Sequence, residues 1–243
     1  MEGVRSDFWR SWLPARQALK QLVGLRSLYH LVRSVADLAT TRPTGVAAVC
    51  ERTYRGGDDP WTYRDEAQQM RYRRALAMIS DELHGRQSPN VLEVGCGEGM
   101  FTALLAPLCG QLLATDAAPT ALDRARRRLG DVPQVMLRRL DVLTDSLGSG
   151  FDVIVMDHLI DLFGRRSAYR QIAARLAAAL KPDGVVLIGA MRAFDLAERA
   201  WWAPLLPWGG VAILAWIGRN TALVPVTTVT ESFYTYTLFR RRT

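Results

Sequence analysis

The chain has 243 residues, enough for one α/β core with a smaller cap, and its 49% apolar and 23% charged residues are ordinary for a folded domain. Its formal charge of +7 lies at the two ends, because residues 1–45 hold seven Lys and Arg against three Asp and Glu, and residues 240–242 are all arginine. The rest of the chain is balanced, which argues against a nucleic-acid-binding protein, whose basic residues usually cover the face that holds the substrate.

The cysteines and the N-terminal sequence indicate the cellular compartment in which the protein is expected. Cys50, Cys96 and Cys109 are widely spaced and include no C-x-x-C pair, so we expect neither a disulfide framework nor a metal site. The N-terminus lacks the continuous apolar stretch and the small-residue cleavage site of a signal peptide. These features favour a cytoplasmic location.

Residues 1–45 are predicted to form an amphipathic helical extension. From Phe8 to Ala39, apolar residues recur at three- and four-residue steps between arginines and a lysine, and TRPTG at 41–45 ends the pattern. A helix packed on the domain or on a second copy of the chain is the favoured interpretation. Peripheral membrane contact through residues 1–40 is the alternative, because an interfacial helix also needs Trp and Leu opposite Arg.

Residues 46–243 are predicted to form the main domain, which begins with a helical cap over 46–87. Within the cap, RGGDDPW at 55–61 indicates a turn, and a helix is expected over about 63–83. Strands and helices then alternate through a core at 88–192. The predicted strands are 91–94, 111–116, 134–140, 151–157 and 185–190, and the predicted helices are 100–108, 119–129 and 166–180. KPDG at 181–184 is expected to turn the chain into the fifth strand. Strands rich in Val, Ile and Leu, separated by helices, predict a doubly wound α/β fold with a parallel sheet.

The C-terminal part departs from this rhythm. Within residues 193–222, the segment Ala200–Gly218 has no charged residue, but its prolines and paired glycines argue against a straight membrane-spanning helix. We expect an apolar lid over the active site or a dimer surface there, with a membrane-dipping hairpin over 200–218 as the alternative. Two runs within 223–243, at 223–230 and 232–240, predict an antiparallel edge hairpin, which makes the sheet seven-stranded and mostly parallel.

The stretch VLEVGCGEG, from Val91 to Gly99, predicts a cofactor-binding loop, since glycines after a strand let a ligand lie against the backbone. About twenty residues further on, Asp116 ends the second strand, where an acid can accept the hydroxyls of a ribose. Glu93 stands where the charge of a pyrophosphate would be repelled, whereas a ligand with an ammonium and a sulfonium would be attracted. The cofactor implied is therefore S-adenosylmethionine rather than a dinucleotide.

Five motifs resemble those of class I S-adenosylmethionine-dependent methyltransferases. VLEVGCGEG, LLATD, RLDVL, FDVIVMD and LKPDGVVLIG occur in the order of that family and cover residues 88–192. DDPW at 58–61, the following helix with Arg71, and LEVGCGEGMFTALLAPLC look similar to the NodS-like branch, whose founding members are nodulation N-methyltransferases acting on an amino sugar. This closer resemblance covers residues 50–160.

The resemblance implies a role for each matching residue. It implies Glu93 near the methionine amino group, with Gly95, Cys96 and Gly97 against the cofactor. Asp116 is implied at the ribose with Ala117 beside the adenine, and Asp141 at the adenine amine with Val142 packing the ring. Trp61 and Arg71 are expected to close the site from the cap, although a core aromatic and a solvated arginine explain the two residues equally well. Asp157, which ends the fourth strand, completes the set.

The acceptor side is where the sequence departs from the family. His158 is the histidine at a strand end, and its ordinary pKa suits a general base, with a helix-start histidine as the alternative. MDHLIDLF replaces the pattern that is usual there, and Asp161 stands where a tyrosine is common. The motifs that grip a nucleic-acid base are missing after the fourth strand, so nucleic acid is not expected as a substrate.

These observations predict an enzyme that transfers a methyl group to nitrogen or oxygen of a small molecule, such as an amino sugar or another secondary metabolite. Two alternatives stay open. The acceptor is lipid-like and membrane-associated, or the chain is a binding module that holds S-adenosylmethionine without turnover. A homodimer also stays open.

Overall fold

The structure, a computed structural model, describes residues 45–61, 63–83, 89–192, 209–231 and 233–242. The predicted extension over 1–44 and the first part of the apolar segment, residues 200–208, lie outside the described residues. The helices are α3 (Val46–Arg55), α4 (Glu66–Glu82), α5 (Met100–Leu105), α6 (Pro119–Leu129), α7 (Arg166–Ala179) and α9 (Gly210–Asn220), with 3-10 turns at Ala106–Leu108 and Ile160–Phe163. The strands are β1 (Asn90–Val94), β2 (Gln111–Asp116), β3 (Val135–Arg139), β4 (Phe151–Asp157), β5 (Leu180–Met191), β6 (Leu223–Thr230) and β7 (Tyr234–Arg241).

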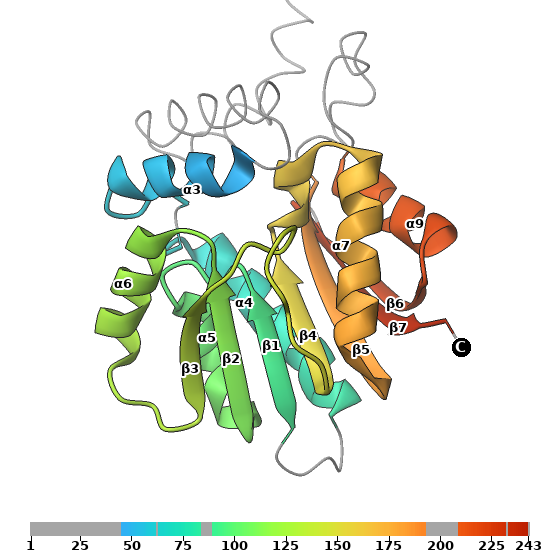
Figure 1. Ribbon diagram of the computed structural model, residues 1–243, viewed down its shortest axis with the longest axis horizontal. Helices are drawn as coiled ribbons and strands as arrows, with labels where there is room; N and C mark the ends of the chain where they lie inside the picture. Colours follow the sequence, from blue (N-terminus) through green and yellow to red (C-terminus); the bar gives the residue numbers. More distant parts are fainter. Residues whose placement is uncertain (1–44, 62, 84–88, 193–208, 232, 243) are drawn as a thin grey trace, which may run out of the picture.

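All seven strands form one mixed sheet, in the order β3-β2-β1-β4-β5-β7-β6 (Figure 1). The first five strands in this order run parallel, and β7 pairs antiparallel with both β5 and β6. The predicted fold class, a mostly parallel seven-stranded sheet with an antiparallel edge hairpin, is confirmed. Strand order reverses between β1 and β4, and ligands of open α/β sheets bind at such a switch point.

Alternation of side chains along the central strands supplies both faces of the core. Val91, Val153 and Val155 point to the face that α4 and α5 cover. Leu92 and Ile154 point to the opposite face, which packs against α7 and α9. Both faces are apolar because a parallel sheet is covered on each side, which explains the continuous Val, Ile and Leu runs of the sequence.

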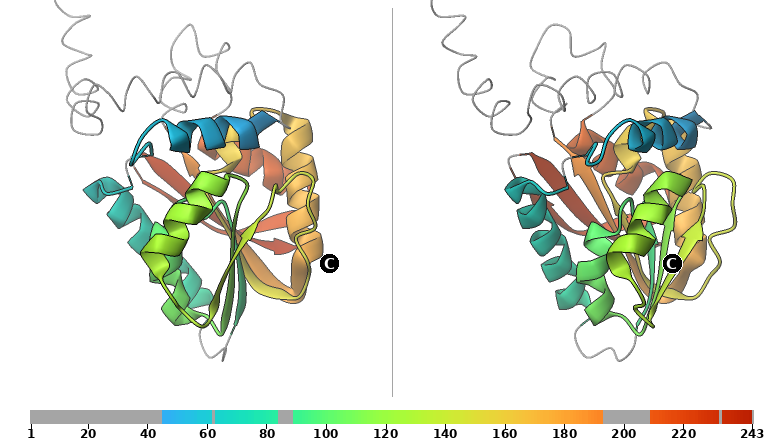
Figure 2. Two further views of the ribbon diagram at one scale, coloured as in Figure 1. Left: turned by 60° about the vertical axis from the view of Figure 1, so that its left-hand side comes forward. Right: turned by 90° about the vertical axis from the view of Figure 1, so that its left-hand side faces the viewer.

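Helix α3 lies across one end of the sheet, in the position of a cap (Figure 1), and two further views place it at the same end (Figure 2). Polar contacts fasten it to α6. Glu51 on α3 accepts hydrogen bonds from the backbone N–H and the hydroxyl of Thr120, at 3.0 and 2.7 Å. Arg124 on α6 donates to the carbonyl oxygen of Tyr54 at 2.7 Å and pairs with Glu98 at 2.6 Å. These contacts hold the cap over the glycine-rich loop.

Strand β5 differs from its prediction. The sequence KPDG lies within the strand, which begins at Leu180, and the pairing with β4 shifts register between Phe151 and Val153. Gly184 is required there, since a Cβ atom would lie 2.8 Å from the carbonyl oxygen of Phe151. The chain therefore runs through KPDG as an irregular part of β5, where the sequence predicted a turn before the strand.

Helix α9 contains the described part of the predicted apolar segment. It packs against β5, β6, β7 and α7, and Ile213, Leu214 and Ile217 are buried there. One face of α9 is therefore part of the core of the domain, whereas Val211 and Ala215 are exposed. Within the described ranges, no helix is both long and apolar enough to cross a membrane.

The two outer strands of the sheet differ in their local features. β6 contains Pro225, and its register with β7 shifts between Pro225 and Thr227. On β3, at the opposite edge, Arg138 and Arg139 are exposed beside the exposed Met136.

Candidate active site

A pocket opens where β1, β2 and β4 end, between the glycine-rich loop and the cap. Its empty space, including the open mouth, is about 1140 Å³. Most of the residues predicted to form the site line it. These residues are Trp61, Arg71, Glu93, Gly95, Cys96, Asp116, Ala117, Asp141, Val142, Asp157 and His158. The pocket therefore brings together residues from the cap and from four segments of the core.

Gly97, the remaining predicted site residue, is not among the residues that line the pocket, but it contacts residues that are. Its φ of +54° is a left-handed conformation, and a Cβ atom there would lie 2.4 Å from the hydroxyl of Tyr63 and 2.8 Å from that of Tyr54. Its backbone N–H donates to Asp116 Oδ2 at 2.9 Å. Only glycine satisfies both the backbone conformation and the close approach of the two tyrosines.

Asp116 is held firmly at the end of β2. Oδ2 accepts from Gly97, and Oδ1 accepts from the backbone N–H of Ala118 at 2.8 Å. Burial raises the pKa of this carboxyl to about 6, although the backbone hydrogen bonds act in the opposite direction. The carboxyl is thus a fixed acceptor with lone pairs left for hydroxyl donors, which is what a ribose offers.

Glu93 lies deeper in the pocket and is buried. Its Oε2 accepts a hydrogen bond from Thr102 Oγ1 at 2.7 Å, and no other side-chain bond to it is found among the described residues. Burial raises its pKa to about 8, and the negative charges of Asp157 and Asp116 act in the same direction. A cation beside this carboxyl would favour its ionised form.

Asp141 and Val142 form the wall after β3. Asp141 Oδ1 accepts from the backbone N–H of Leu143 at 2.9 Å, and the backbone N–H of Leu140 bonds to the carbonyl oxygen of Asp116. Val142 is buried, and Leu140 and Val46 also line this part of the pocket. The wall offers a flat ring an apolar surface next to a carboxylate.

The cap contributes Trp61 and Arg71. Trp61 stands edge-on to Tyr54, with ring centres 6.4 Å apart. Arg71 is buried, lies 3.4 Å from Asp157 Oδ2, and has its guanidinium 4.9 Å from the ring centre of Tyr72. Its interpretation as a solvated arginine is therefore wrong.

His158 follows β4 in a left-handed conformation, with φ of +51°, and its backbone N–H donates to the carbonyl oxygen of Gly189 at 3.0 Å. Burial lowers its pKa well below the ordinary value, and the charge of Arg71 lowers it further. The expectation of an ordinary histidine pKa is thus wrong. In this pocket the imidazole is neutral at pH 7.

Sequence reasoning did not identify four polar residues of this pocket. The Tyr54 and Tyr63 hydroxyls bond to each other at 2.7 Å, and both tyrosines, with Gln68, line the pocket from the cap. Asp161, in the 3-10 turn after β4, lines it from the core. The signal for Asp161 was present in the sequence as a departure from the family pattern. The three cap residues carry no such signal, because the fold alone brings them over the loop.

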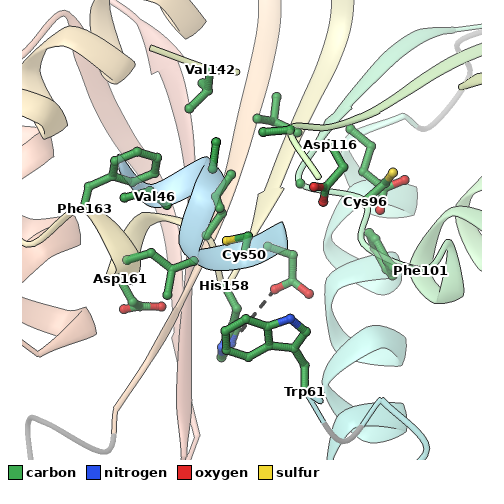
Figure 3. A pocket seen from close by; sticks show the side chains of 18 of the residues that line it. Val46, Cys50, Trp61, Cys96, Phe101, Asp116, Val142, His158, Asp161 and Phe163 are labelled. Carbon is green, nitrogen blue, oxygen red and sulfur yellow. Dashed lines mark ion pairs between the residues drawn. The ribbon is translucent and has the colours of Figure 1, made fainter. Parts of the chain in front are cut away.

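Figure 3 shows how the labelled side chains divide. Asp116 and Cys96 lie at one side of the pocket, Asp161 and Phe163 lie at the other, and Trp61 and His158 lie between them. Among the described residues, no group of His, Cys, Asp and Glu has the arrangement of a metal site.

The sheet order, the glycine loop after β1 and the acid that ends β2 define the class I methyltransferase fold. The family profile of nodulation protein S (NodS) matches residues 43–210, more than half of the chain, so the protein belongs to the NodS family. The resemblance inferred from the sequence motifs is confirmed.

Individual relatives agree with this assignment. The chain is 33% identical over 140 residues to nodulation protein S of Bradyrhizobium diazoefficiens, a match that covers 56% of this chain and 64% of the relative. It is also similar to the crystal structure of the N-methyltransferase NodS from Bradyrhizobium japonicum WM9 in complex with S-adenosyl-L-homocysteine. That likeness has a TM-score of 0.67 and 25% identity, and it covers 82% of this chain and all of the other. Magnesium protoporphyrin IX methyltransferase from Synechocystis PCC 6803, 14% identical with a TM-score of 0.57, shares the fold, with 71% of this chain and 83% of the other covered.

Proposed function

We propose that the protein is an S-adenosylmethionine-dependent methyltransferase that acts on nitrogen or oxygen of a small molecule. The observation that carries this proposal is the pair of buried acids, Glu93 and Asp116, on either side of the glycine-rich loop in a NodS-family fold. S-adenosylmethionine supplies a methyl group that its sulfonium makes electrophilic. The NodS crystal structure from Bradyrhizobium japonicum WM9 is a complex with S-adenosyl-L-homocysteine, which supports this choice of cofactor.

Residues of the pocket are placed to contact each part of S-adenosylmethionine. Glu93 would face the amino group of the methionine part, where a positive charge lowers the cost of ionising a buried carboxyl. Asp116 would hold the ribose hydroxyls, and Asp141 with Val142 would hold the adenine by its amine and its ring. Trp61 and Arg71 would close the pocket from the cap.

Methyl transfer needs alignment and a dry site more than it needs acid–base groups, because the carbon is already activated. The cap supplies both, since α3 covers the loop and is fastened to α6 through Glu51 and Arg124. A neutral His158 is suited to hydrogen bonding with the acceptor and is a weak base, so we propose for it a positioning role rather than strong proton abstraction.

A small-molecule acceptor is supported by the position of the pocket, between the cap and the carboxyl ends of the core strands. Nitrogen is favoured over oxygen because the NodS protein of known structure is an N-methyltransferase. The cytoplasmic location, a peripheral membrane contact through 1–40 and 200–218, and a homodimer stay predictions.

The proposal is tested by titrating the protein with S-adenosyl-L-homocysteine in a calorimeter. Binding with one ligand per chain is expected, at micromolar concentrations or below. In parallel, transfer from S-adenosylmethionine to a panel of primary amines and alcohols is followed by mass spectrometry, as a gain of one methyl group. The absence of any heat of binding at millimolar ligand would contradict the proposal.

A further inference from the structure

Four polar side-chain atoms lining the pocket have no hydrogen-bond partner among the described residues. They are Gln68 Oε1, Arg71 Nε, His158 Nε2 and Asp161 Oδ1, and all four are shielded from solvent. Buried polar atoms are nearly always bonded in folded proteins, because leaving one unpaired costs about 1–3 kcal/mol. A cluster of them in one pocket indicates that a polar part of a ligand completes their bonding.

Asp161 and Asp157 are both acids at this end of the pocket, but they differ in whether a cation pairs with them. Asp157 is countered by Arg71 at 3.4 Å and also accepts a hydrogen bond from the Tyr236 hydroxyl at 2.7 Å. Asp161 accepts one bond, at Oδ2 from the backbone N–H of Met191 at 3.0 Å, and forms no ion pair with any described residue. Among the described residues, one carboxylate oxygen of Asp161 thus has no hydrogen-bond partner, and no cation forms an ion pair with this side chain.

The position of Asp161 separates it from the groups proposed to hold the cofactor's ribose. In Figure 3 it lies with Phe163 at the side of the pocket opposite Asp116 and Cys96. The apolar side chains of Leu159, Leu162 and Phe163 line the pocket near it along the chain. In such surroundings a carboxylate attracts a cation more strongly than it would in water, and a charge-assisted hydrogen bond is stronger than a neutral one.

Resting on the proposed function, we propose that Asp161 is the specificity-determining residue for the methyl acceptor: its Oδ1 binds the acceptor's amino group and selects an amine over the alcohol of the same shape. An amine is favoured because it is protonated at neutral pH and neutralises the charge, whereas a hydroxyl only completes the hydrogen bond. Before methyl transfer the bound ammonium gives one proton to the Asp161 carboxylate, which frees the nitrogen lone pair for the methyl group. An apolar body on the acceptor would contact the leucines and Phe163.

The ionisation of Asp161 gives the selection a pH dependence. Burial raises its pKa to about 7, the charge of Asp157 acts in the same direction, and the Met191 hydrogen bond and the charge of Arg71 oppose it. Among the described residues, the hydroxyl of Tyr169 also interacts with the charge of Asp161, and the neutral imidazole of His158 lines the same pocket. Since an ammonium binds the ionised carboxyl, amine affinity is expected to rise between pH 6 and pH 8.

The test uses benzylamine and benzyl alcohol, which have the same apolar body and different head groups. Each is titrated calorimetrically into the protein saturated with S-adenosyl-L-homocysteine, at pH 6, 7 and 8. Benzylamine is expected to bind at least tenfold more tightly than benzyl alcohol at pH 8, with an affinity that rises several-fold from pH 6. The affinity for benzyl alcohol should stay level.

Asp161→Asn keeps the size of the side chain and an oxygen that can accept from Met191. This variant is expected to bind both probes with equal affinity at every pH and to bind S-adenosyl-L-homocysteine within about twofold of the original protein. Asp123→Asn, in the exposed part of α6, is the matched control and should keep the amine preference.

Equal affinities in the original protein, no binding of benzylamine at millimolar concentration, or an amine preference that survives in Asp161→Asn would each overturn the inference. The comparison of the two probes in the original protein stands even where the variant fails to fold. Failure of the original protein to bind S-adenosyl-L-homocysteine would instead overturn the proposed function, so the two failures are distinguishable.

Discussion

At the scale of single residues, the ionisation of Glu93 is coupled to the charge of whatever occupies the pocket. Its raised pKa of about 8 means that most molecules of the free protein carry a protonated Glu93 at pH 7. The ammonium of the methionine part, at the position proposed for it, would favour the ionised form, so the proton would be released. We therefore expect binding and proton release to be linked at this residue.

Binding of S-adenosyl-L-homocysteine at pH 7 is accordingly expected to release up to one proton per chain. The measurement is calorimetry in two buffers with different heats of ionisation, which gives different apparent binding enthalpies when protons are exchanged. Glu93→Gln should abolish the difference between the buffers while it weakens binding. Proton release that is unchanged in this variant would assign the proton to another group.

Asp116 is predicted to contribute more to ligand binding than any exposed acid. Asp116→Ala removes both the proposed ribose contact and the acceptor of the Gly97 and Ala118 amides. Affinity for S-adenosyl-L-homocysteine, measured by calorimetry, is expected to fall more than tenfold. Asp123→Ala on the exposed part of α6 is the control and should leave the affinity unchanged, and an unchanged affinity in Asp116→Ala itself would show that this carboxyl does not hold the ligand.

At the scale of elements, the cap and the glycine-rich loop fit together through Gly97. Gly97→Ala introduces a Cβ atom that meets the hydroxyls of Tyr63 and Tyr54, in addition to the cost of its left-handed backbone. Gly164 has nearly the same φ, +57°, in a left-handed conformation, but nothing lies within 4 Å of its Cβ position. The two glycines therefore separate backbone strain from steric contact.

Gly164→Ala is expected to lower the free energy of unfolding by about 1 kcal/mol, the usual cost of a left-handed residue with a side chain. Gly97→Ala should lower it further, by an added 1–3 kcal/mol, because the cap has to move. Denaturant unfolding of both variants measures the difference. Equal losses of stability in the two variants would mean that the cap moves to accommodate the added Cβ atom at no cost in free energy.

The elements of the core were predictable because each carries a local signal. β2, α6 and β4 begin and end where the sequence predicts, since runs of Val, Ile and Leu, Pro119 at a helix start and acids at strand ends all mark boundaries. The sequence also places the acids Glu93 and Asp116 at strand ends, and both line the pocket. KPDG was mistaken for a turn, because composition does not reveal that β5 continues through a register shift.

Other features of the site depend on tertiary contacts that no local pattern encodes. The burial of Arg71 and the low pKa of His158 arise from neighbours on distant elements, α4 and β4, that meet only in the folded chain. Tyr54 reaches Gly97 because α3 is fastened to α6 by Glu51, a glutamate that resembles any other exposed acid in the sequence. The apolar segment that contains α9 was expected to form a lid or a dimer surface, because its composition suits either of these as well as a buried helix.

At the scale of the whole molecule, ligand binding should be visible as thermal stabilisation. A ligand that binds only the folded state at one hundred times its dissociation constant stabilises that state by about 2.7 kcal/mol. For a chain of this size that corresponds to a rise in Tm of roughly 5–10 °C. Thermal unfolding with and without S-adenosyl-L-homocysteine measures it, with adenosine as a comparison that lacks the ammonium and should give a smaller rise.

The two ends of the sheet have a consequence for self-association. An outer strand with unpaired backbone N–H groups can pair with a strand of a neighbouring molecule. In β6, Pro225 has no backbone N–H group to donate, and the register shift beside it makes the row of hydrogen-bonding groups irregular. At the opposite end, two exposed arginines would be brought against their own copies in an antiparallel pairing. Both outer strands thus disfavour a pairing that would join the sheets of two molecules into one.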